Sequence, residues 1–349
     1  DTYNNRGLSK NNSGDPNGAL EDFNKAIEMD PNLADAYNHR GLSKNKSGDH
    51  NGALEDFNKA IEIDPSLPDT YNNRGTTKSD LEDFNGGLQD FNKAIEIDPK
   101  HADAYNNRGL NKKRLGDPNG AIKDFNKAIE IDPKHADAYN NRGLNKNNLG
   151  DHNGALKDFN KAIEIHPKHA DAYNNRGLSK NKLEDPNGAL EDFNKAIEIN
   201  PKHADAYNNR GTTKSNLKDY NGGLKDFNKT IAIDPNHRHA YHNRGLNKKR
   251  LKDYSGAIKD LNKAIKINPK NVNAFNTRGS IKINLKDYSG AIKDINIAIG
   301  IDPDNGFCFY NRGIAKFQLG DKEGACLDWS KAEEAGYYDA NDAIKNLCN

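Results

Sequence analysis

An Arg-Gly dipeptide returns every 34 residues along this chain of 349 residues, without any insertion. Its glycines are Gly7, Gly41, Gly75, Gly109, Gly143, Gly177, Gly211, Gly245, Gly279 and Gly313. A fixed period of this length is typical of a solenoid, in which each supersecondary unit packs mainly on its two neighbours. We number each repeat from the residue that corresponds to Ala136, so that the Arg-Gly glycine is position 8. The period therefore predicts one elongated array rather than two or three globular domains.

Composition sets few further limits. Only 34% of the residues are hydrophobic and 30% are charged, so the periodic placement of the apolar residues, not their amount, predicts a folded chain. The net charge is +1 with both signs mixed in every repeat, and no basic stripe indicates nucleic acid as a partner. No apolar run approaches the roughly 18 residues of a membrane span. The chain begins at Asp1 inside a repeat, so we expect a natural start, with any targeting segment, upstream of this residue.

Residues 102–135 show how one repeat is expected to fold. The first half contains no proline and reaches Gly116, a residue suited to the left-handed position after a helix. Asp117 is the expected N-cap of a second helix, which Pro133 ends. That second helix carries apolar side chains at helical spacing on one face: Ala121, Phe125, Ala128 and Ile129. Each repeat therefore predicts helix A, a short turn, helix B and a proline turn.

Six positions carry a recurrent residue type: an aromatic at 4, Gly at 8, Ala at 20, an aromatic at 24, Ala at 27 and Pro at 32. This pattern resembles the tetratricopeptide repeat (TPR) family, in particular its bacterial-type arrays with Asn-Arg-Gly repeats. The resemblance implies an all-α fold, namely a right-handed α-solenoid (superhelix) of about ten 34-residue helix-turn-helix repeats. The array is expected to cover residues 1–337, and its first repeat lacks the start. Residues 338–349 are expected to form a C-terminal capping helix with Ala343, Ile344 and Leu347 on one face.

Three charged positions are constant in all ten repeats. Position 7 is always Arg, position 11 always Lys and position 23 always Asp, as in Arg142, Lys146 and Asp158. Two cations on helix A and one carboxylate on helix B predict an interhelical pair. In this pair the Arg binds the Asp bidentately and holds the two helices in register.

Similarities at an offset of four repeats, 136 residues, indicate a duplicated block. Repeat three shares two dipeptides with repeat seven, which are Thr76-Thr77 with Thr212-Thr213 and Gly86-Gly87 with Gly222-Gly223. Repeat four shares residues 111–115 with residues 247–251 of repeat eight. Any binding feature is therefore expected to recur four repeats along the chain.

Helix A lines a concave groove in TPR arrays, and the resemblance directs positions 2, 5, 6, 9, 12 and 13 toward it. Positions 5 and 6 are mostly Asn, whose carboxamide can both donate to and accept from a peptide unit. This arrangement is similar to the asparagine ladders of other peptide-cradling solenoids. The predicted peptide-binding residues combine these amides with two basic pairs: Asn72, Asn73, Asn106, Asn107, Lys113, Arg114, Asn140, Asn141, Asn174, Asn175, Asn208, Asn209, Asn243, Lys249 and Arg250. An acidic rim is added at position 2 by Asp35, Asp103, Asp137, Asp171 and Asp205.

The same amides also admit a structural interpretation, as residues that are common in the family and bind no ligand. A third interpretation is the carboxylate clamp that binds chaperone tails, which requires Lys at position 5 and Asn at position 9. Here these positions are mostly Asn and Leu or Thr, so the clamp pattern is absent.

No metal site and no cofactor are predicted. One histidine per repeat stands at position 34, and neighbouring repeats lie about 8–10 Å apart, too far for these histidines to share one ion. They are His101, His135, His169 and His203. Another group, His237, His239 and His242, has no Cys or carboxylate partner at metal-ligand spacing.

The three cysteines lie near the C-terminus. Cys326 begins helix B of the last repeat and Cys348 ends the expected capping helix, so either a disulfide or two buried thiols fits this pair. A disulfide would place the protein in an oxidising compartment, periplasmic or secreted, whereas free thiols would suit the cytoplasm.

No nucleophile–base pair, phosphate-binding loop or pair of catalytic carboxylates is recognisable, so we do not expect an enzyme. The predicted function is a non-catalytic protein–protein interaction scaffold that binds an extended peptide or protein segment in the concave groove through the asparagine ladder. Two alternatives stay open: the interaction module of a larger, truncated enzyme or secretion component, and an envelope assembly protein that uses its convex surface.

Overall fold

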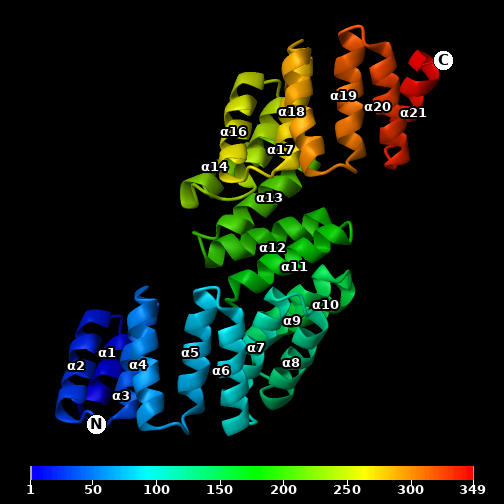
Figure 1. Cartoon of the computed structure of the whole chain (residues 1–349). Coiled ribbons are helices and arrows are strands. Elements are labelled where there is room, and N and C mark those ends of the chain that lie inside the picture. Colours follow the sequence, from blue (N-terminus) through cyan, green and yellow to red (C-terminus); the bar gives the residue numbers. More distant parts are fainter. Residues whose placement is uncertain (1, 349) are drawn as a thin grey trace. The chain divides into compact units, whose positions relative to one another are not determined.

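Each repeat of the computed structural model, which describes residues 2–348, forms two neighbouring helices joined by a short turn (Figure 1). Helix A of successive repeats is α1 (Thr2–Asn12), α3 (Ala34–Lys46), α5 (Pro68–Asp80), α7 (Ala102–Arg114), α9 (Ala136–Asn148), α11 (Ala170–Lys182), α13 (Ala204–Asn216), α15 (Ala240–Arg250), α17 (Val272–Asn284) and α19 (Gly306–Gln318). Helix B is α2 (Pro16–Met29), α4 (His50–Ile63), α6 (Phe84–Ile97), α8 (Pro118–Ile131), α10 (His152–Ile165), α12 (Pro186–Ile199), α14 (Tyr220–Ile233), α16 (Tyr254–Ile267), α18 (Tyr288–Ile301) and α20 (Lys322–Glu334). The described residues contain no strand, and the predicted all-α repeat fold is confirmed.

Short-range signals define the helix ends as the sequence predicts. The Asp117 carboxylate caps α8 by accepting a hydrogen bond from the Gly120 amide at 2.8 Å. Gly116 precedes it with φ of 85°, in the left-handed region. Five repeats place Glu or Lys at the same turn position, with φ between 62° and 66°. The turn geometry is therefore kept even where the residue has a side chain that disfavours it.

Small and aromatic residues alternate in the core between the two helices of a repeat. Ala121, Phe125 and Ala128 of α8 are fully buried, and burial of such an aromatic side chain stabilises the fold by about 1.5–3 kcal/mol. A methyl group on Gly109 of α7 would lie 2.7 Å from Phe125 Cε1, so position 8 must be glycine. The predicted close crossing of the two helices is confirmed.

The chain divides into two compact units between Ser179 and Lys180, within α11. In each unit, consecutive helices A contact each other directly, as α7 does with α9 and α13 does with α15. We call the surface that these helices form in each unit the helix A face. The predicted binding residues all lie on these helices.

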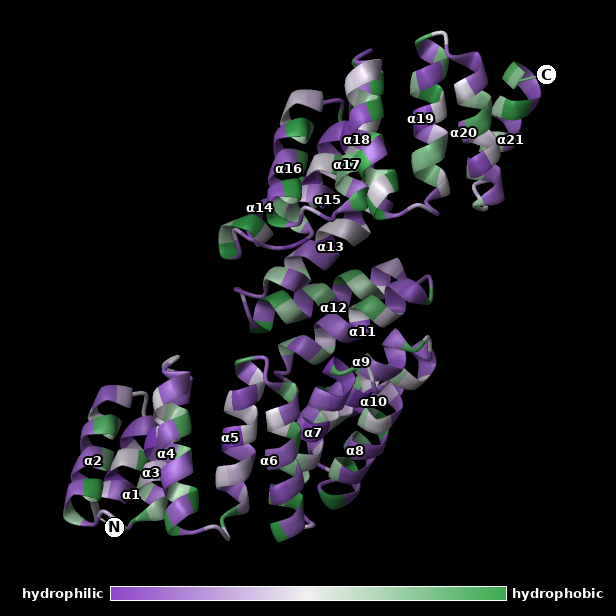
Figure 2. Ribbon diagram, in the orientation of Figure 1, coloured by the Kyte–Doolittle hydropathy of each residue, from purple (hydrophilic) through white to green (hydrophobic). Residues whose placement is uncertain are grey.

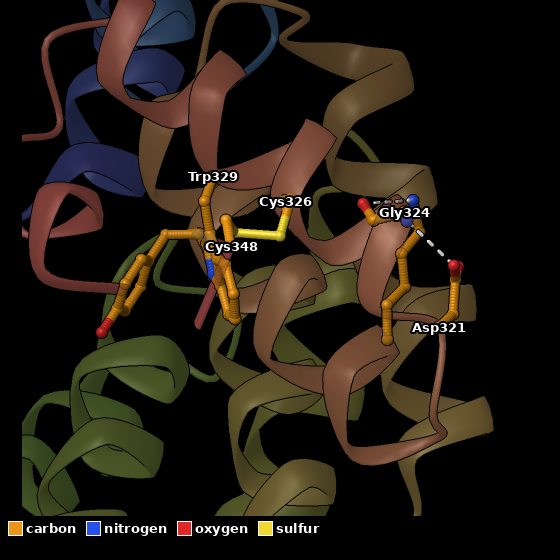
Figure 3. The surroundings of a disulfide bond; sticks show 7 residues. Asp321, Gly324, Cys326, Trp329 and Cys348 are labelled. Carbon is orange, nitrogen blue, oxygen red and sulfur yellow. Dashed lines mark hydrogen bonds between the residues drawn. A yellow bond between two sulfur atoms is a disulfide. The ribbon is translucent and has the colours of Figure 1, made fainter. Parts of the chain in front are cut away.

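A C-terminal cap covers the last hairpin. The short helix α21 (Ala340–Ala343) continues into a π-helical turn, Ile344–Cys348, and its apolar side chains pack against Trp329 of α20. A disulfide joins Cys326 of α20 to Cys348 (Figure 3). The residue 349 included in the predicted capping segment lies outside the described residues, as does residue 1 of the predicted array.

Hydropathy is mixed along every helix, with hydrophilic and hydrophobic residues interspersed (Figure 2). None of the helices between residues 2 and 348 combines the length and the apolar character that crossing a membrane requires.

Candidate functional site

Carboxamides of neighbouring repeats are hydrogen bonded to one another on the helix A face. Asn141 Nδ2, at position 6 of α9, donates to Asn106 Oδ1, at position 5 of α7, with a distance of 3.0 Å. The same bond, 2.9–3.1 Å long, recurs as Asn73–Asn38, Asn107–Asn72, Asn175–Asn140, Asn243–Asn208 and Asn311–Asn276. We call these position 5 and position 6 side chains the amide ladder. It links consecutive helices A within each unit.

Positions 5 and 6 differ in what they leave for a ligand. Asn106 is only 6% exposed, because it lies in the interface between α7 and α9, and its Nδ2 also donates to Asn107 Oδ1 at 3.2 Å. Asn141 is half-buried, and of its two N–H groups one is used by the bond to Asn106. In this repeat, position 6 is therefore more accessible than position 5, whereas Asn175 at position 6 of α11 is itself only 8% exposed.

The basic residues at positions 7 and 11 are neutralised by helix B. Arg142 Nε and its second terminal nitrogen bind the two oxygens of Asp158 at 2.9 and 2.6 Å, and Lys146 Nζ lies 2.8 Å from Asp158 Oδ2. Asp158 is 4% exposed. The predicted interhelical pair is confirmed. In the equivalent pair of repeat two, the hydrogen bond from Arg40 to Asp56 raises the pKa of Arg40 above its ordinary value.

The same guanidinium reaches the preceding repeat. Arg142 donates from its other terminal nitrogen to Asn126 Oδ1 on α8 at 2.7 Å. Sequence analysis missed this contact, because Asn126 occupies an exposed position of helix B. The available signal was Asn at position 25 of nine repeats and its replacement by Ser330 in the last, which has no following Arg.

Two pairs of cations on the helix A face remain without an acidic partner. Lys113 and Arg114 at the end of α7, and Lys249 and Arg250 at the end of α15, form no ion pair within residues 2–348. Burial lowers the pKa of Lys113 below its ordinary value, and the adjacent Arg114 charge lowers it further. The pKa of Lys249 is lowered for the same two reasons. A bound anion would relieve this cost.

The acidic rim is partly engaged by the position 34 histidines. His135 Nδ1 caps α9 by accepting from the Ala138 amide at 3.3 Å. Its Nε2 lies 3.1 Å from Asp103 Oδ1, a close ionic contact whose angles fall outside hydrogen-bond geometry. Asp103 raises the pKa of His135, and His135 lowers that of Asp103. His101 with Asp69, His169 with Asp137 and His237 with Asp205 repeat the contact.

No cluster of His, Cys, Asp or Glu suited to a metal ion occurs among the residues that the structure describes. In the other histidine group, His237 pairs with Asp205 and His242 Nε2 lies 3.4 Å from Thr277 Oγ1, so these rings face different partners.

Comparison with known proteins identifies the repeat. Family profiles described as "Tetratricopeptide repeat" match residues 1–33, 34–67, 68–101, 102–135, 136–169, 170–203, 193–225, 239–271 and 272–305. No curated protein matches the sequence.

Among solved structures, the chain is similar to one in the APC/C hetero-tetramer Cut9–Hcn1, with TM-score 0.67 and 16% identity over 90% of this chain and 75% of that one. It is also similar to a tetratricopeptide repeat protein from Parabacteroides merdae, with TM-score 0.55 and 22% identity over 71% and 99% of the two chains. A third similarity is to PilF of Pseudomonas aeruginosa, with TM-score 0.53 and 18% identity over 59% and 94%. At these identities the likeness concerns the fold. Together with the repeat matches along most of its length, it shows that this chain belongs to the tetratricopeptide repeat family.

Proposed function

We propose that this chain, a protein–protein interaction scaffold by its family, binds an extended polar peptide segment on the helix A face without catalysing a reaction. The observation that carries the proposal is the amide ladder, which holds the position 6 carboxamide of most repeats in a fixed orientation on that face. An Asn carboxamide offers donors and an acceptor, so it can bond a peptide unit without reading its side chain.

The internal bond of each position 6 amide favours ligand binding rather than competing with it. Asn141 uses one N–H group for Asn106, which leaves its second N–H group for a ligand. Because the first bond already fixes the side-chain rotamer, ligand binding would lose little further conformational entropy. A preoriented amide is therefore a better ligand group than a freely rotating one.

Repeat spacing suits an extended strand. Packed helices lie about 8–10 Å apart, and an extended chain rises about 3.3 Å per residue. One position 6 amide would therefore meet about every third residue of the bound segment. Since the face is rich in amides and charges, a polar segment matches it better than an amphipathic helix, which requires an apolar groove.

The test starts from a phage-displayed library of linear peptides selected on the wild-type protein. The affinity of a selected peptide is then measured by calorimetry for the triple variant Asn73→Ala, Asn107→Ala, Asn141→Ala, whose carboxamides are all half-buried. Each lost hydrogen bond is worth about 1 kcal/mol, or about fivefold in Kd, so we expect a weakening of about a hundredfold. Unchanged affinity would exclude the helix A face as the site.

A matched control separates binding from stability. The variant Asn38→Ala, Asn106→Ala removes the buried acceptors of Asn73 and Asn141 but keeps their carboxamides on the face. We expect this control to lower the thermal midpoint like the triple variant, yet to weaken the peptide far less. Equal losses of affinity in both variants would assign the amides a purely structural role.

A further inference from the structure

Two equivalent cavities open on the helix A face, one in each compact unit. A cavity of about 190 Å³ between α5, α6 and α7 is lined by Ser79, Leu110 and Asn111 among others. A second, of about 280 Å³, lies between α13, α14 and α15 and is lined by Ser215, Leu246 and Asn247. Each residue of the second trio stands 136 residues after its counterpart in the first. The duplicated block therefore carries a cavity in each copy.

A glycine in helix B shapes each cavity. Position 20 is Ala in the other repeats but Gly87 in repeat three and Gly223 in repeat seven. A methyl group on Gly87 would lie 2.5 Å from Asn111 Nδ2 and 2.6 Å from Ser79 Oγ. Its absence lets Asn111 donate to Ser79 Oγ at 2.8 Å and to the Phe84 carbonyl at 3.1 Å. These bonds form a fixed polar wall.

An unpaired cation stands at the mouth of each cavity. Arg114 lines the first and Arg250 the second, and the half-buried Lys113 and Lys249 precede them in sequence. No carboxylate pairs with any of the four in the described part of the chain, unlike the Arg and Lys residues at positions 7 and 11. Lys249 Nζ donates to Ser280 Oγ at 2.6 Å, a neutral partner that leaves its charge uncompensated.

The two copies differ in charge. Asp80 lines the first cavity, whereas Asn216 takes its place in the second. Lys218 also lines the second cavity, and the corresponding residue of repeat three is Glu82. The first cavity therefore holds an internal carboxylate that competes for Arg114. The second presents Arg250 and Lys218 without such a competitor.

We propose that the cavity at Arg250 binds the carboxylate side chain of a Glu or Asp residue in the bound peptide, and that the cavity at Arg114 is a weaker copy of the same site. This inference rests on the peptide binding proposed above. A guanidinium recognises a carboxylate through two parallel hydrogen bonds, which Asn247 can supplement with the N–H group that it does not donate to the Tyr220 carbonyl. The cavity volume suits one side chain. Nucleic acid would instead require a row of cations, whereas here acidic residues separate the two basic pairs.

Two synthetic peptides of alternating Ser and Asn provide the probe, one with a single central Glu and the other with Gln in its place. Calorimetry on the full chain should show that the Glu peptide binds about tenfold more tightly than the Gln peptide. Arg250→Gln should remove most of this difference and leave the Gln peptide unaffected. In the Arg250→Gln background, Asp80→Asn should restore part of the preference for Glu, because it removes the competitor of Arg114.

The outcomes separate this inference from the proposed function. If both peptides bind equally and Arg250→Gln changes neither, the carboxylate site is overturned, while the position 6 variants still test the peptide face. If neither peptide binds, the acidic-peptide proposal is overturned as well. Tighter binding of a single-stranded oligonucleotide that is lost in Arg250→Gln would replace the peptide with nucleic acid. Circular dichroism checks that each variant keeps its helix content.

Discussion

One guanidinium in most repeats holds three partners at once. Arg142 binds Asp158 bidentately within its own hairpin, donates to Asn126 of the preceding hairpin, and lies over the Tyr139 ring with 5.4 Å between guanidinium carbon and ring centroid. The side chain therefore joins folding of a repeat to docking of that repeat on its neighbour. A change at this residue affects both.

Replacement of Asp158 by Ala tests the pair directly. The substitution leaves Arg142 and Lys146 without their carboxylate in a largely buried site, so we expect a loss of about 3 kcal/mol in the free energy of unfolding. Urea denaturation followed by circular dichroism measures it. The matched control is Glu164→Ala, which breaks the exposed pair with Lys161 and should change the free energy of unfolding far less. Similar losses in the two variants would contradict a special role for Asp158.

Some residue contacts were predictable and others were not. The Arg142–Asp158 pair follows from the sequence, because opposite charges recur at a fixed offset inside one repeat. Burial of Asn106 does not follow, because it depends on how closely the next helix A approaches. The cavity beside Asn111 was missed for a similar reason: the sequence shows Gly87, but the void depends on the direction of the neighbouring side chains.

At the scale of elements, the turn before α9 responds to pH. Contact with Asp103 raises the pKa of His135, so the stabilisation is present below pH 6.5, the ordinary histidine value, and is lost as pH rises through the raised pKa. His135 lowers the pKa of Asp103, so the stabilisation is also lost as pH falls through that lowered value, below 3.8. The contact is therefore strongest between these limits.

The variant Asp103→Asn should consequently lower the thermal midpoint more at pH 5.5 than at pH 8.5. Because Asp103 is largely exposed, we expect an effect of at most about 1 kcal/mol at the lower pH. The charge of Asp132 also raises the pKa of His135, and this residue is unchanged in Asp103→Asn. A separate variant, Asp132→Asn, therefore serves as the comparison. An equal shift of the midpoint at both pH values would show that the contact carries no net charge interaction.

The C-terminal cap predicts a specific pattern of thiol labelling. Burial raises the pKa of the Cys308 thiol to about 12, so it should not react with iodoacetamide at pH 8 in the native protein. Mass spectrometry should find no label on the native chain, one after unfolding without reductant, and three after unfolding with reductant. Three labels without reductant would show that Cys326 and Cys348 are not bonded.

The loop closed by the disulfide between Cys326 and Cys348 spans 22 residues, so reduction should destabilise the cap by about 3 kcal/mol.

At the scale of the whole molecule, the 34-residue period predicted the hairpins because the contacts between helix A and helix B of one hairpin recur from repeat to repeat. Contacts between repeats were harder to predict from the sequence. The two partners belong to different repeats, and a residue such as Asn126 resembles an ordinary surface residue. The division at Ser179 and Lys180 has no counterpart in the sequence pattern, which continues unchanged through α11.

The two ends of the array should differ in stability. The Arg6 side chain of α1 is 54% exposed, whereas that of Arg142, which also donates to Asn126 of the preceding hairpin, is 17% exposed. At the other end, α20 is covered by α21 and tied to it by the disulfide. Hydrogen exchange followed by mass spectrometry should therefore show faster exchange in α1 and α2 than in α19 and α20. Equal protection at both ends would contradict this, and α9 and α10 provide the interior reference.

The bond from Arg142 to Asn126 has an evolutionary consequence. Each repeat offers the next an Asn on helix B and receives an Arg from it, so nearly all junctions are chemically interchangeable. Unequal recombination within the coding sequence can then insert or excise whole repeats without creating a mismatched surface. Array length becomes a heritable variable that changes in steps of 34 residues, and selection can adjust the length of the helix A face while its chemistry stays constant.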